Sequence, residues 1–461
     1  MKKISFFGLV LAFIAMAIFI VSCSQPLFPD GSSYRPGSSN SDDDQTGGDI
    51  PDWETDGSGP CGRMTVAEQL EWLRNNALAN TVWYVWAWME APYETIHFMQ
   101  DIHGVGGLET PITVFLRTHS SSTNRLRLLL GASSCMTMLN VQNDNSLILE
   151  NIVLRGRISS SSPLVVVNAG RLEQWNNSEI NNVIHFGFFP QGAVSVREGA
   201  TFIMSGNALI TGNSTVGVSV SNGAVLEMEG DARITNNSIG VSLQGDSALI
   251  MRGNTHISGH EYEGVRSQLS RIYMHNEAQI WDNGDSGDNA GVLLGNSYLI
   301  MYNKAKIHSN KFGGGVFAGN ESTIRMYDEA SIHSNINLNA NGGGGVTLSF
   351  SSLYMHDYSV TIRGNSSENS QGGGVRLESN STLTIHRGLI YGIDGNGDFN
   401  DANKNNSLGP PNGHALYIVD TWAAGTLYYG VVPMPVPMST PPDNFRNQTF
   451  GVQGGVLIDN G

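Results

Sequence analysis

Positive charge is scarce in this chain. Only 14% of its 461 residues are charged, and 25 lysines and arginines stand against 41 aspartates and glutamates, which gives a formal net charge of −16. Because no stripe of basic residues is present to neutralise phosphates, nucleic acid is not expected as a partner. The small charged fraction, together with 55 glycines, indicates a β architecture with many turns.

The repeated part of the chain also lacks the apolar spacings of three and four residues that helical repeat proteins show. Instead, a unit of roughly two dozen residues recurs from Gly192 to Tyr391 with the pattern G-V…L-x-M-x-x-x-A-x-I-x-x-N. Within each unit the apolar residues alternate, as at Leu226 and Met228, which is the period of a strand with one buried face. The repeat therefore excludes helical solenoids, and it is too short for the blades of a propeller.

Three residue types recur at fixed places in the unit. Methionines fall 23 to 29 residues apart, an isoleucine follows each after six or seven residues, and an asparagine or, once, His260 comes three residues later. The methionines are Met204, Met228, Met251, Met274, Met301, Met326 and Met355. The asparagines are Asn213, Asn237, Asn283, Asn310, Asn335 and Asn365. We expect the apolar columns to stack as the core of a coil of parallel strands, and the asparagines to stack as a ladder of amides in one turn.

This pattern resembles the right-handed parallel β-helix of the pectin-lyase-like superfamily, and more closely the repetitive β-helix lipoproteins of bacterial envelopes. The resemblance covers about Ile112 to Tyr391. It implies an all-β fold, a right-handed parallel β-helix solenoid closed by an N-terminal capping helix. Since the superfamily contains lyases, hydrolases and adhesins alike, the resemblance implies the fold and leaves the function open.

The first 23 residues resemble a lipoprotein signal sequence. Lys2 and Lys3 precede an apolar stretch, Ile4 to Val21, which is followed by Ser22 and Cys23. In signals of that class the cysteine is acylated and becomes the mature N-terminus; an ordinary signal peptide or a transmembrane anchor is the alternative. Acylation of Cys23 predicts an exported protein that is anchored by lipid to the bacterial cell envelope, at the outer membrane or the cell surface.

Past the signal, the chain divides into a flexible Ser/Gly/Asp-rich tether, an N-terminal cap, the β-helix and an irregular C-terminal cap. They span residues 24–60, 61–111, 112–392 and 393–461. In the N-terminal cap, Thr65 and Glu68 form a capping box for an amphipathic helix. The apolar face of that helix is Val66, Leu70, Leu73 and Ala77. In the β-helix, irregular early coils precede eight or nine regular coils between Leu164 and Ile390.

Two cysteines, Cys61 and Cys135, remain once Cys23 is acylated. An even number of cysteines outside the cytoplasm is compatible with a disulfide that ties the cap to an early coil. Two unpaired thiols are the alternative, because the sequence does not give the distance between them.

Acidic and amide side chains alternate just after the repeat, at Asp394, Asn396, Asp398 and Asn400. Oxygen ligands at every second position are the order used by calcium loops. The match is poor, because Phe399 stands where such a loop requires glycine. A surface loop rich in Asn and Asp is therefore the alternative to a calcium site, and no other cofactor is predicted.

Outward positions beside the methionine and isoleucine columns carry aromatic residues in the C-terminal half of the repeat. These candidates are Tyr273, His275, Trp281, Tyr302, His308, Tyr327, His333, Tyr354 and His356. A row of rings spaced one coil apart suits the flat faces of a polymeric sugar, so it predicts a ligand-binding stripe. The alternative is that like residues stack along a solenoid for stability alone.

No catalytic set stands out in the sequence. Lyases of the superfamily use clustered calcium-binding aspartates with an arginine base, and its hydrolases use paired aspartates followed by His-Gly; neither motif is found here. Glu227 and Glu229 share one face of a strand, but nothing distinguishes an acid from a base between them. We predict a non-catalytic, adhesin-like surface that binds a glycan or a protein. The alternative is a divergent polysaccharide lyase or glycoside hydrolase.

Overall fold

The computed structural model describes residues 66, 68–70, 73, 77, 80–87, 94–96, 101–102, 111–118, 125–130, 137–142, 144–156, 158–160, 162–185, 191–285, 289–339, 342–368, 372–391, 400–402, 416–418, 426–429, 432–433, 450–453 and 456–459. All of them belong to the second of two units, residues 50–461. The predicted signal and tether lie outside the described residues, as do Cys23, Cys61 and Cys135.

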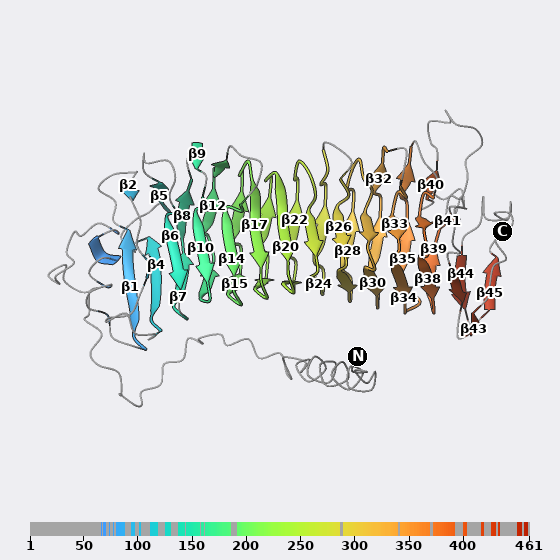
Figure 1. The fold of residues 1–461 in the computed structure, drawn as a ribbon, viewed down its shortest axis with the longest axis horizontal. Coiled ribbons are helices and arrows are strands. Elements are labelled where there is room, and N and C mark those ends of the chain that lie inside the picture. Colours follow the sequence, from blue (N-terminus) through green and yellow to red (C-terminus); the bar gives the residue numbers. More distant parts are fainter. Residues whose placement is uncertain are drawn as a thin grey trace, which may run out of the picture. The chain divides into compact units, whose positions relative to one another are not determined.

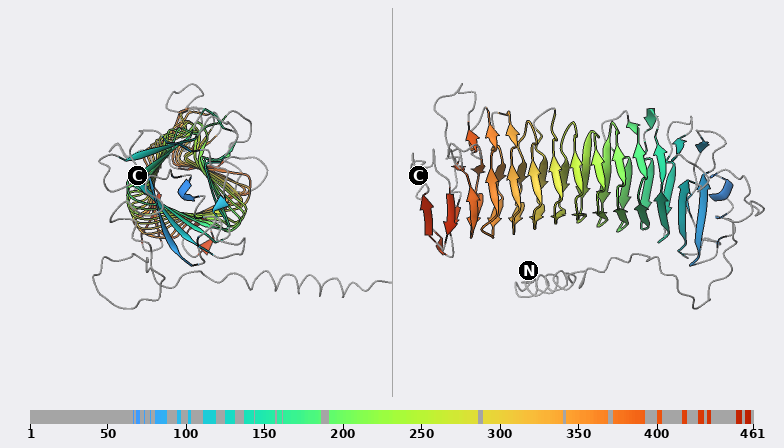
Figure 2. Two further views of the ribbon diagram at one scale, coloured as in Figure 1. Left: turned by 90° about the vertical axis from the view of Figure 1, so that its left-hand side faces the viewer. Right: turned by 180° about the vertical axis from the view of Figure 1, so that it is seen from behind.

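The described chain is an all-β parallel β-helix, as predicted from the repeat. Three long sheets run along the solenoid, and each regular coil contributes one strand to each sheet (Figures 1 and 2). Nine consecutive regular coils, from β11 (Arg171–Gln174) to β38 (Thr382–Ile385), confirm the expected eight or nine. Parallel pairing already begins at β1 (Val82–Ala87), before residue 112. The right-handed sense of the coil stays a prediction.

The methionine sheet, named after its column of buried methionines, has 14 strands. They are β1, β4 (Thr113–Thr118), β7 (Ser146–Glu150), β11, β15 (Thr201–Met204), β18 (Val225–Met228), β21 (Ala248–Met251), β24 (Arg271–Met274), β27 (Tyr298–Met301), β30 (Thr323–Met326), β34 (Ser352–Met355), β38, β42 (Thr426–Tyr429) and β43 (Val432–Pro433). Each methionine lies opposite the next in the parallel register, from Met204 to Met355. All seven are fully buried, so the column is the core that the sequence predicted.

The isoleucine sheet follows the methionine sheet in each coil and also has 14 strands. They are β2 (Glu94–Ile96), β5 (Leu126–Leu130), β8 (Ile152–Arg155), β12 (Glu179–Asn181), β16 (Leu209–Thr211), β19 (Arg233–Thr235), β22 (His256–Ser258), β25 (Gln279–Trp281), β28 (Lys306–His308), β31 (Ser331–His333), β35 (Thr361–Arg363), β39 (Gly388–Ile390), β44 (Phe450–Gln453) and β45 (Val456–Asp459). The pairing turns antiparallel at β44 and β45. The repeating parallel pattern therefore ends at β39 in this sheet.

The valine sheet completes each coil and has 12 strands. They are β3 (Asp101–Ile102), β6 (Leu139–Gln142), β10 (Val165–Asn168), β14 (Val194–Arg197), β17 (Val216–Ser221), β20 (Ile239–Gln244), β23 (Val265–Gln268), β26 (Val292–Gly295), β29 (Val316–Gly319), β33 (Val346–Ser349), β37 (Val375–Glu378) and β41 (Leu416–Ile418). Two short sheets form at wider turns between the isoleucine and valine sheets. They pair β9 (Ile158–Ser160) with β13 (Ile184–His185), and β32 (Ile336–Asn337) with β36 (Ser366–Ser367) and β40 (Asp401–Ala402).

Part of the predicted cap is described. Val66, Glu68–Leu70 and Leu73 have helical backbone, and the predicted apolar face, including Ala77, is buried. The side chain of Gln69 holds this segment to β1, since its Nε2 donates to the carbonyl oxygen of Trp86 at 2.8 Å and its Oε1 accepts from the Trp86 N–H at 3.0 Å. A continuous capping helix stays a prediction.

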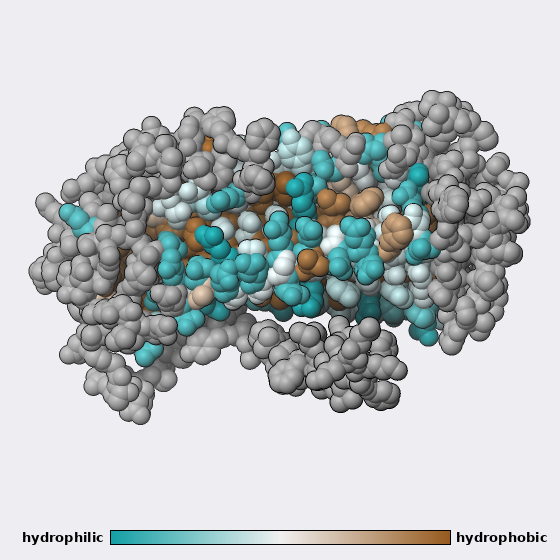
Figure 3. All heavy atoms as spheres, in the orientation of Figure 1, coloured by the Kyte–Doolittle hydropathy of each residue, from teal (hydrophilic) through white to brown (hydrophobic). Residues whose placement is uncertain are grey.

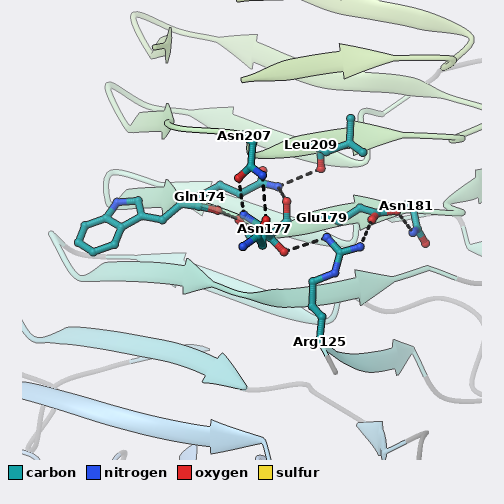
Figure 4. Close-up of polar contacts among 9 residues, drawn as sticks. Arg125, Gln174, Asn177, Glu179, Asn181, Asn207 and Leu209 are labelled. Atoms are coloured by element: carbon teal, nitrogen blue, oxygen red, sulfur yellow. Dashed lines mark hydrogen bonds and ion pairs between the residues drawn. The ribbon is translucent and has the colours of Figure 1, made fainter. Parts of the chain in front are cut away.

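The first regular coils are joined by polar contacts (Figure 4). The Arg125 guanidinium donates to the carbonyl oxygen of Asn177 at 2.8 Å and to the Glu179 carboxylate at 2.7 Å. Gln174 lies opposite Met204 and takes the place of a methionine in the column. Its buried Nε2 donates to the carbonyl oxygens of Ser178 and Leu209, at 3.1 and 3.0 Å. Since a polar residue in the core needs such partners, these bonds explain how the column starts with glutamine.

The predicted asparagine ladder is present in the turn after the isoleucine sheet. Wherever an asparagine follows in the next coil, the buried side-chain Nδ2 donates to its Oδ1 at 2.7–2.9 Å. The same Oδ1 also accepts the backbone N–H of the preceding asparagine at 2.9–3.1 Å. The second Nδ2 hydrogen reaches an isoleucine carbonyl oxygen of the preceding coil at 3.0–3.4 Å. From Asn283 onward, the ladder thus gives both Nδ2 hydrogens of each buried amide a partner.

His260 replaces asparagine in one coil and imitates its hydrogen bonds. Its Nδ1 accepts the Asn237 N–H at 3.0 Å, so its Nε2 must carry the proton that is donated to the Ile234 carbonyl oxygen at 3.1 Å. Complete burial lowers the pKa of His260 to about 4. The ring is therefore neutral at pH 7, as both hydrogen bonds require.

A column of glycines covers the asparagine ladder and explains the G-V that opens the repeat. A Cβ on Gly291 would lie 2.4 Å from Cγ of Asn310, and a Cβ on Gly345 would lie 2.5 Å from the Gly374 carbonyl oxygen. Such distances are shorter than side chains tolerate, so only hydrogen fits between the ladder and the next coil.

We expect His260→Asn to reduce the acid sensitivity of the fold. The folded-state pKa of His260, about 4, lies below the ordinary 6.5, so the unfolded chain takes up this proton first as pH falls. The contribution of neutral His260 to the free energy of unfolding is therefore complete above pH 6.5. It is lost as pH falls from 6.5 to 4, which lowers the free energy of unfolding by an amount on the order of 3 kcal/mol. Urea unfolding at pH 7 and pH 4.5 measures the difference for each protein. If the variant and the parent chain lost equal stability between pH 7 and pH 4.5, His260 would not be the source of the acid sensitivity.

We expect Gly291→Ala to destabilise the solenoid by about 1–3 kcal/mol, because its Cβ overlaps the Asn310 amide. Gly295, in the same coil, is the matched control, since a Cβ there meets only the Ser267 carbonyl oxygen at 3.9 Å. Gly295→Ala should change stability by less than about 0.5 kcal/mol. Thermal and urea denaturation compare the two variants, and equal effects would argue against the steric role of the glycine column.

Candidate functional site

The candidate aromatic residues form two ladders on the outside of the solenoid. The first ladder consists of His275, Tyr302, Tyr327, His356 and His386, and it follows the ends of the methionine-sheet strands. The second ladder consists of Trp281, His308 and His333, and it lies at the ends of the isoleucine-sheet strands. The predicted stripe is therefore two rows, separated by the turn and short strand between them.

The rings of each ladder are nearly parallel. In the first ladder, ring centroids lie 4.9 Å apart for His275 and Tyr302, 5.0 Å for Tyr302 and Tyr327, and 4.3 Å for Tyr327 and His356, with interplanar angles of 6–11°. In the second ladder His308 and His333 are 4.9 Å apart. These separations follow from strand spacing, because residues in register lie about 4.8 Å apart along the solenoid.

Stacking determines what the ladders can present to a ligand. The inner rings of the first ladder, Tyr302, Tyr327 and His356, have a neighbouring ring against each face. A sugar therefore cannot lie flat on them, contrary to the simple picture of a stacking platform. What the ladder has instead is a row of ring edges with phenol hydroxyls and imidazole nitrogens, one ring per coil, among which Nε2 of His356 is buried without a hydrogen-bond partner.

Burial favours the neutral form of three ladder histidines, His275, His308 and His356. Desolvation is the largest cause that lowers the pKa of His275, His308 and His356, and it brings that of His308 to about 4. Arg252 and Lys306 add to the effect at His275 and His308, respectively. Desolvation also raises the pKa of Tyr302. The imidazoles of these three histidines thus present hydrogen-bonding nitrogens rather than positive charge.

Polar neighbours orient the second ladder. Ring nitrogens of His308 lie 3.1 Å from Oγ of Ser309 and 3.0 Å from Oε1 of Gln279. Since a carbonyl oxygen only accepts, the Nε2 of His308 carries the proton and donates to Gln279. The imidazole of His308 is therefore fixed in one tautomer.

Three aromatic residues depart from the single stripe that the sequence predicted. Tyr273 lies on the face of the methionine sheet, between Ile250 and Ile300 in the register, and belongs to neither ladder. Tyr354 lies on the same face, with its ring 6.3 Å from that of His356 and the Arg325 guanidinium 5.7 Å from its centroid. His386 was missing from the candidate set, although it follows Ile385 in the methionine column and ends the first ladder.

The possible calcium loop lies mostly outside the described residues, which include only Asn400 of its four candidates. Asn400 is buried, and its side chain ends the asparagine ladder: Oδ1 accepts from Asn365 at 2.9 Å and Nδ2 donates to the Ile362 carbonyl oxygen at 3.0 Å. Calcium at Asp394, Asn396 and Asp398 stays a prediction. Within the described part of the chain, no group of three or more His, Cys, Asp or Glu side chains is placed to hold a metal ion.

The carboxylate pair considered for hydrolysis has an ordinary surface environment. Glu227 forms an ion pair with Arg252 of the next coil. Glu229 follows Met228 at the end of β18, and its backbone N–H donates to the Met204 carbonyl oxygen at 2.9 Å. The arrangement keeps Glu227 engaged and gives the two carboxylates no distinct acid and base environments.

The fold and these outward rows define the class of protein, a parallel β-solenoid with two aromatic ladders on its outside. Comparison with known protein families, curated proteins and solved structures gives no match to this chain. Within the described residues, no helix is long and apolar enough to cross a membrane. On the face seen in Figure 3, apolar side chains lie exposed among polar ones along the solenoid.

Proposed function

We propose that this chain is a lipid-anchored protein of the bacterial cell envelope whose solenoid carries a non-catalytic, adhesin-like binding surface. The two aromatic ladders form that surface, and its ligand is an extended glycan or protein chain that lies along the solenoid. The lipid anchor is inferred from the lipoprotein-like signal sequence that ends at Cys23.

One observation carries the proposal: the first ladder repeats a hydrogen-bonding ring edge in five successive coils. A linear polymer can contact each coil in turn, so weak contacts add along its length. Aromatic residues with a polar tip are also the side chains that binding surfaces favour, because they combine apolar area with a hydrogen-bonding group.

The test is a binding assay of the full-length chain in mild detergent on an array of polymeric glycans and of extracellular-matrix proteins. We expect Tyr302→Ala/Tyr327→Ala to weaken binding at least about tenfold, because it removes two adjacent edges from the middle of the ladder. Full binding by this variant would contradict the proposal, as would a parent chain that binds nothing on the array.

The matched control is Tyr302→Phe/Tyr327→Phe, which keeps both stacked rings and removes only the hydroxyls. Ring stacking contributes about 0.5–1.5 kcal/mol for each pair, so the alanine variant should melt earlier and the phenylalanine variant should not. Weaker binding by the phenylalanine variant at unchanged stability would assign recognition to the hydroxyls. Unchanged binding by the phenylalanine variant would assign recognition to the apolar ring edges.

A further inference from the structure

A row of tight turns connects the valine sheet to the methionine sheet on the side of the latter away from the first ladder. Residues in these turns adopt left-handed backbone conformations, with φ of 48° at Asn296, 54° at Asn320 and 52° at Asn380. Asparagine suits this conformation, because its short polar side chain tolerates positive φ. Leu269 and Phe350 occupy the same place with φ of 54° and 52°.

Phe350 is therefore an unfavourable residue for its position in two respects. A bulky side chain at positive φ strains the backbone, and its ring is left 51% exposed to solvent. No other ring packs against Phe350 among the described residues. Leu269 departs from the same two preferences, so it is the surroundings of Phe350 that distinguish this position.

The turns on either side make a hollow around Phe350. Two residues link β33 to β34, whereas three link β29 to β30 and β37 to β38 in the adjacent coils. The longer turns project further, and Phe350 lies between them. The resulting open hollow of about 590 Å³ is lined by Asn296, Asn320, Glu321, Phe350 and Asn380. We call it the Phe350 notch.

The notch has a fixed backbone. The Glu321 N–H donates to the Phe350 carbonyl oxygen at 2.8 Å, and the Phe350 N–H donates to the Ser379 carbonyl oxygen at 2.9 Å. A row of buried serines holds the turns from inside, with the Ser322 N–H donating to Oγ of Ser351 at 3.1 Å and the Ser351 N–H to Oγ of Ser381 at 3.3 Å. These bonds hold the backbone of the turns that surround the exposed Phe350 ring.

The polar groups of the notch are available to a ligand. Within the described chain, the side-chain amides of Asn296, Asn320 and Asn380 and the carboxylate of Glu321 make no hydrogen bond or ion pair. A comparable turn earlier in the solenoid uses its amide differently, since Nδ2 of Asn222 donates to the Glu198 carboxylate at 2.7 Å. The notch therefore gathers three unengaged amides and one unengaged carboxylate around an exposed ring.

We propose that the Phe350 notch binds a neutral saccharide. One face of a pyranose is a patch of C–H groups that suits an aromatic ring, while its hydroxyls both donate and accept, as amides and a carboxylate do. The size of the notch is within the range of small-ligand sites. The Glu321 carboxylate and the net charge of −16 disfavour acidic sugars, which selects a neutral one.

This site is separate from the aromatic ladders. Phe350 precedes β34 and His356 follows it, so the two lie at opposite ends of one strand, roughly 20 Å apart at about 3.3 Å per residue. The proposal does not depend on the ladder surface, and substitutions in one region leave the other intact.

Saturation-transfer NMR on the full-length chain tests the proposal, with cellotetraose, mannotetraose and chitotetraose as neutral probes and tetragalacturonate as the acidic probe. We expect at least one neutral probe to bind and Phe350→Asn to weaken its binding at least about tenfold. Because asparagine is favoured at this φ, the same variant should unfold at an equal or higher temperature than the parent chain. Loss of binding then cannot be attributed to misfolding.

Leu269→Asn is the matched control. Leu269 has the same conformation and is 50% exposed, but it does not line the notch. This variant should be as stable as Phe350→Asn and should bind the probe like the parent chain. The proposal is overturned if no neutral probe binds, if only tetragalacturonate binds, or if Phe350→Asn binds as well as the parent. Loss of binding in both asparagine variants would equally overturn it.

Discussion

The stacking of coils in register is the constraint on which the rest of this structure depends. Parallel strands pair at about 4.8 Å, so a residue at one place in the repeat lies directly against the residue at that place in the next coil. Inside the solenoid, this brings the amides of Asn310 and Asn335 within 2.9 Å of one another and leaves room only for hydrogen at Gly291. A shift by one residue would turn the methionines outward and unpair the buried amides, so the core and the ladder together fix the register.

The same constraint acts on the outside and changes what the aromatic residues can do. Rings that stand in register stack on each other, and the inner members of the first ladder lose both faces to their neighbours. The ladder therefore stabilises the coil and at the same time offers a periodic row of edges. Stability and binding are not competing explanations here, because the stacking that covers the faces is also what aligns the hydroxyls and ring nitrogens.

Among the positions that break the local rules of the repeat, Gln174, His260 and Phe350 differ in how the break is compensated. Gln174 replaces a core methionine and donates to two carbonyl oxygens, and His260 replaces a ladder asparagine by using its two ring nitrogens. Both ring nitrogens of His260 have partners, whereas Gln174 is satisfied at its Nε2 and has a buried Oε1 without a hydrogen-bond partner. Phe350 has no such compensation, since its strained backbone exposes an apolar ring beside amides without partners. This contrast is why the notch, rather than the other two positions, is taken as a site.

The sequence alone determined the fold, the methionine core, the asparagine ladder and the number of regular coils, because a strict repeat transfers each local preference to every coil. It also identified most of the ladder residues, although Tyr273 and His386 show that position in the repeat must be combined with strand register. Only the tertiary structure decided which ring faces are covered, since that depends on the distance between coils. The Phe350 notch was likewise out of reach of the sequence, because it arises from turns of unequal length in neighbouring coils, which become adjacent only when the solenoid closes.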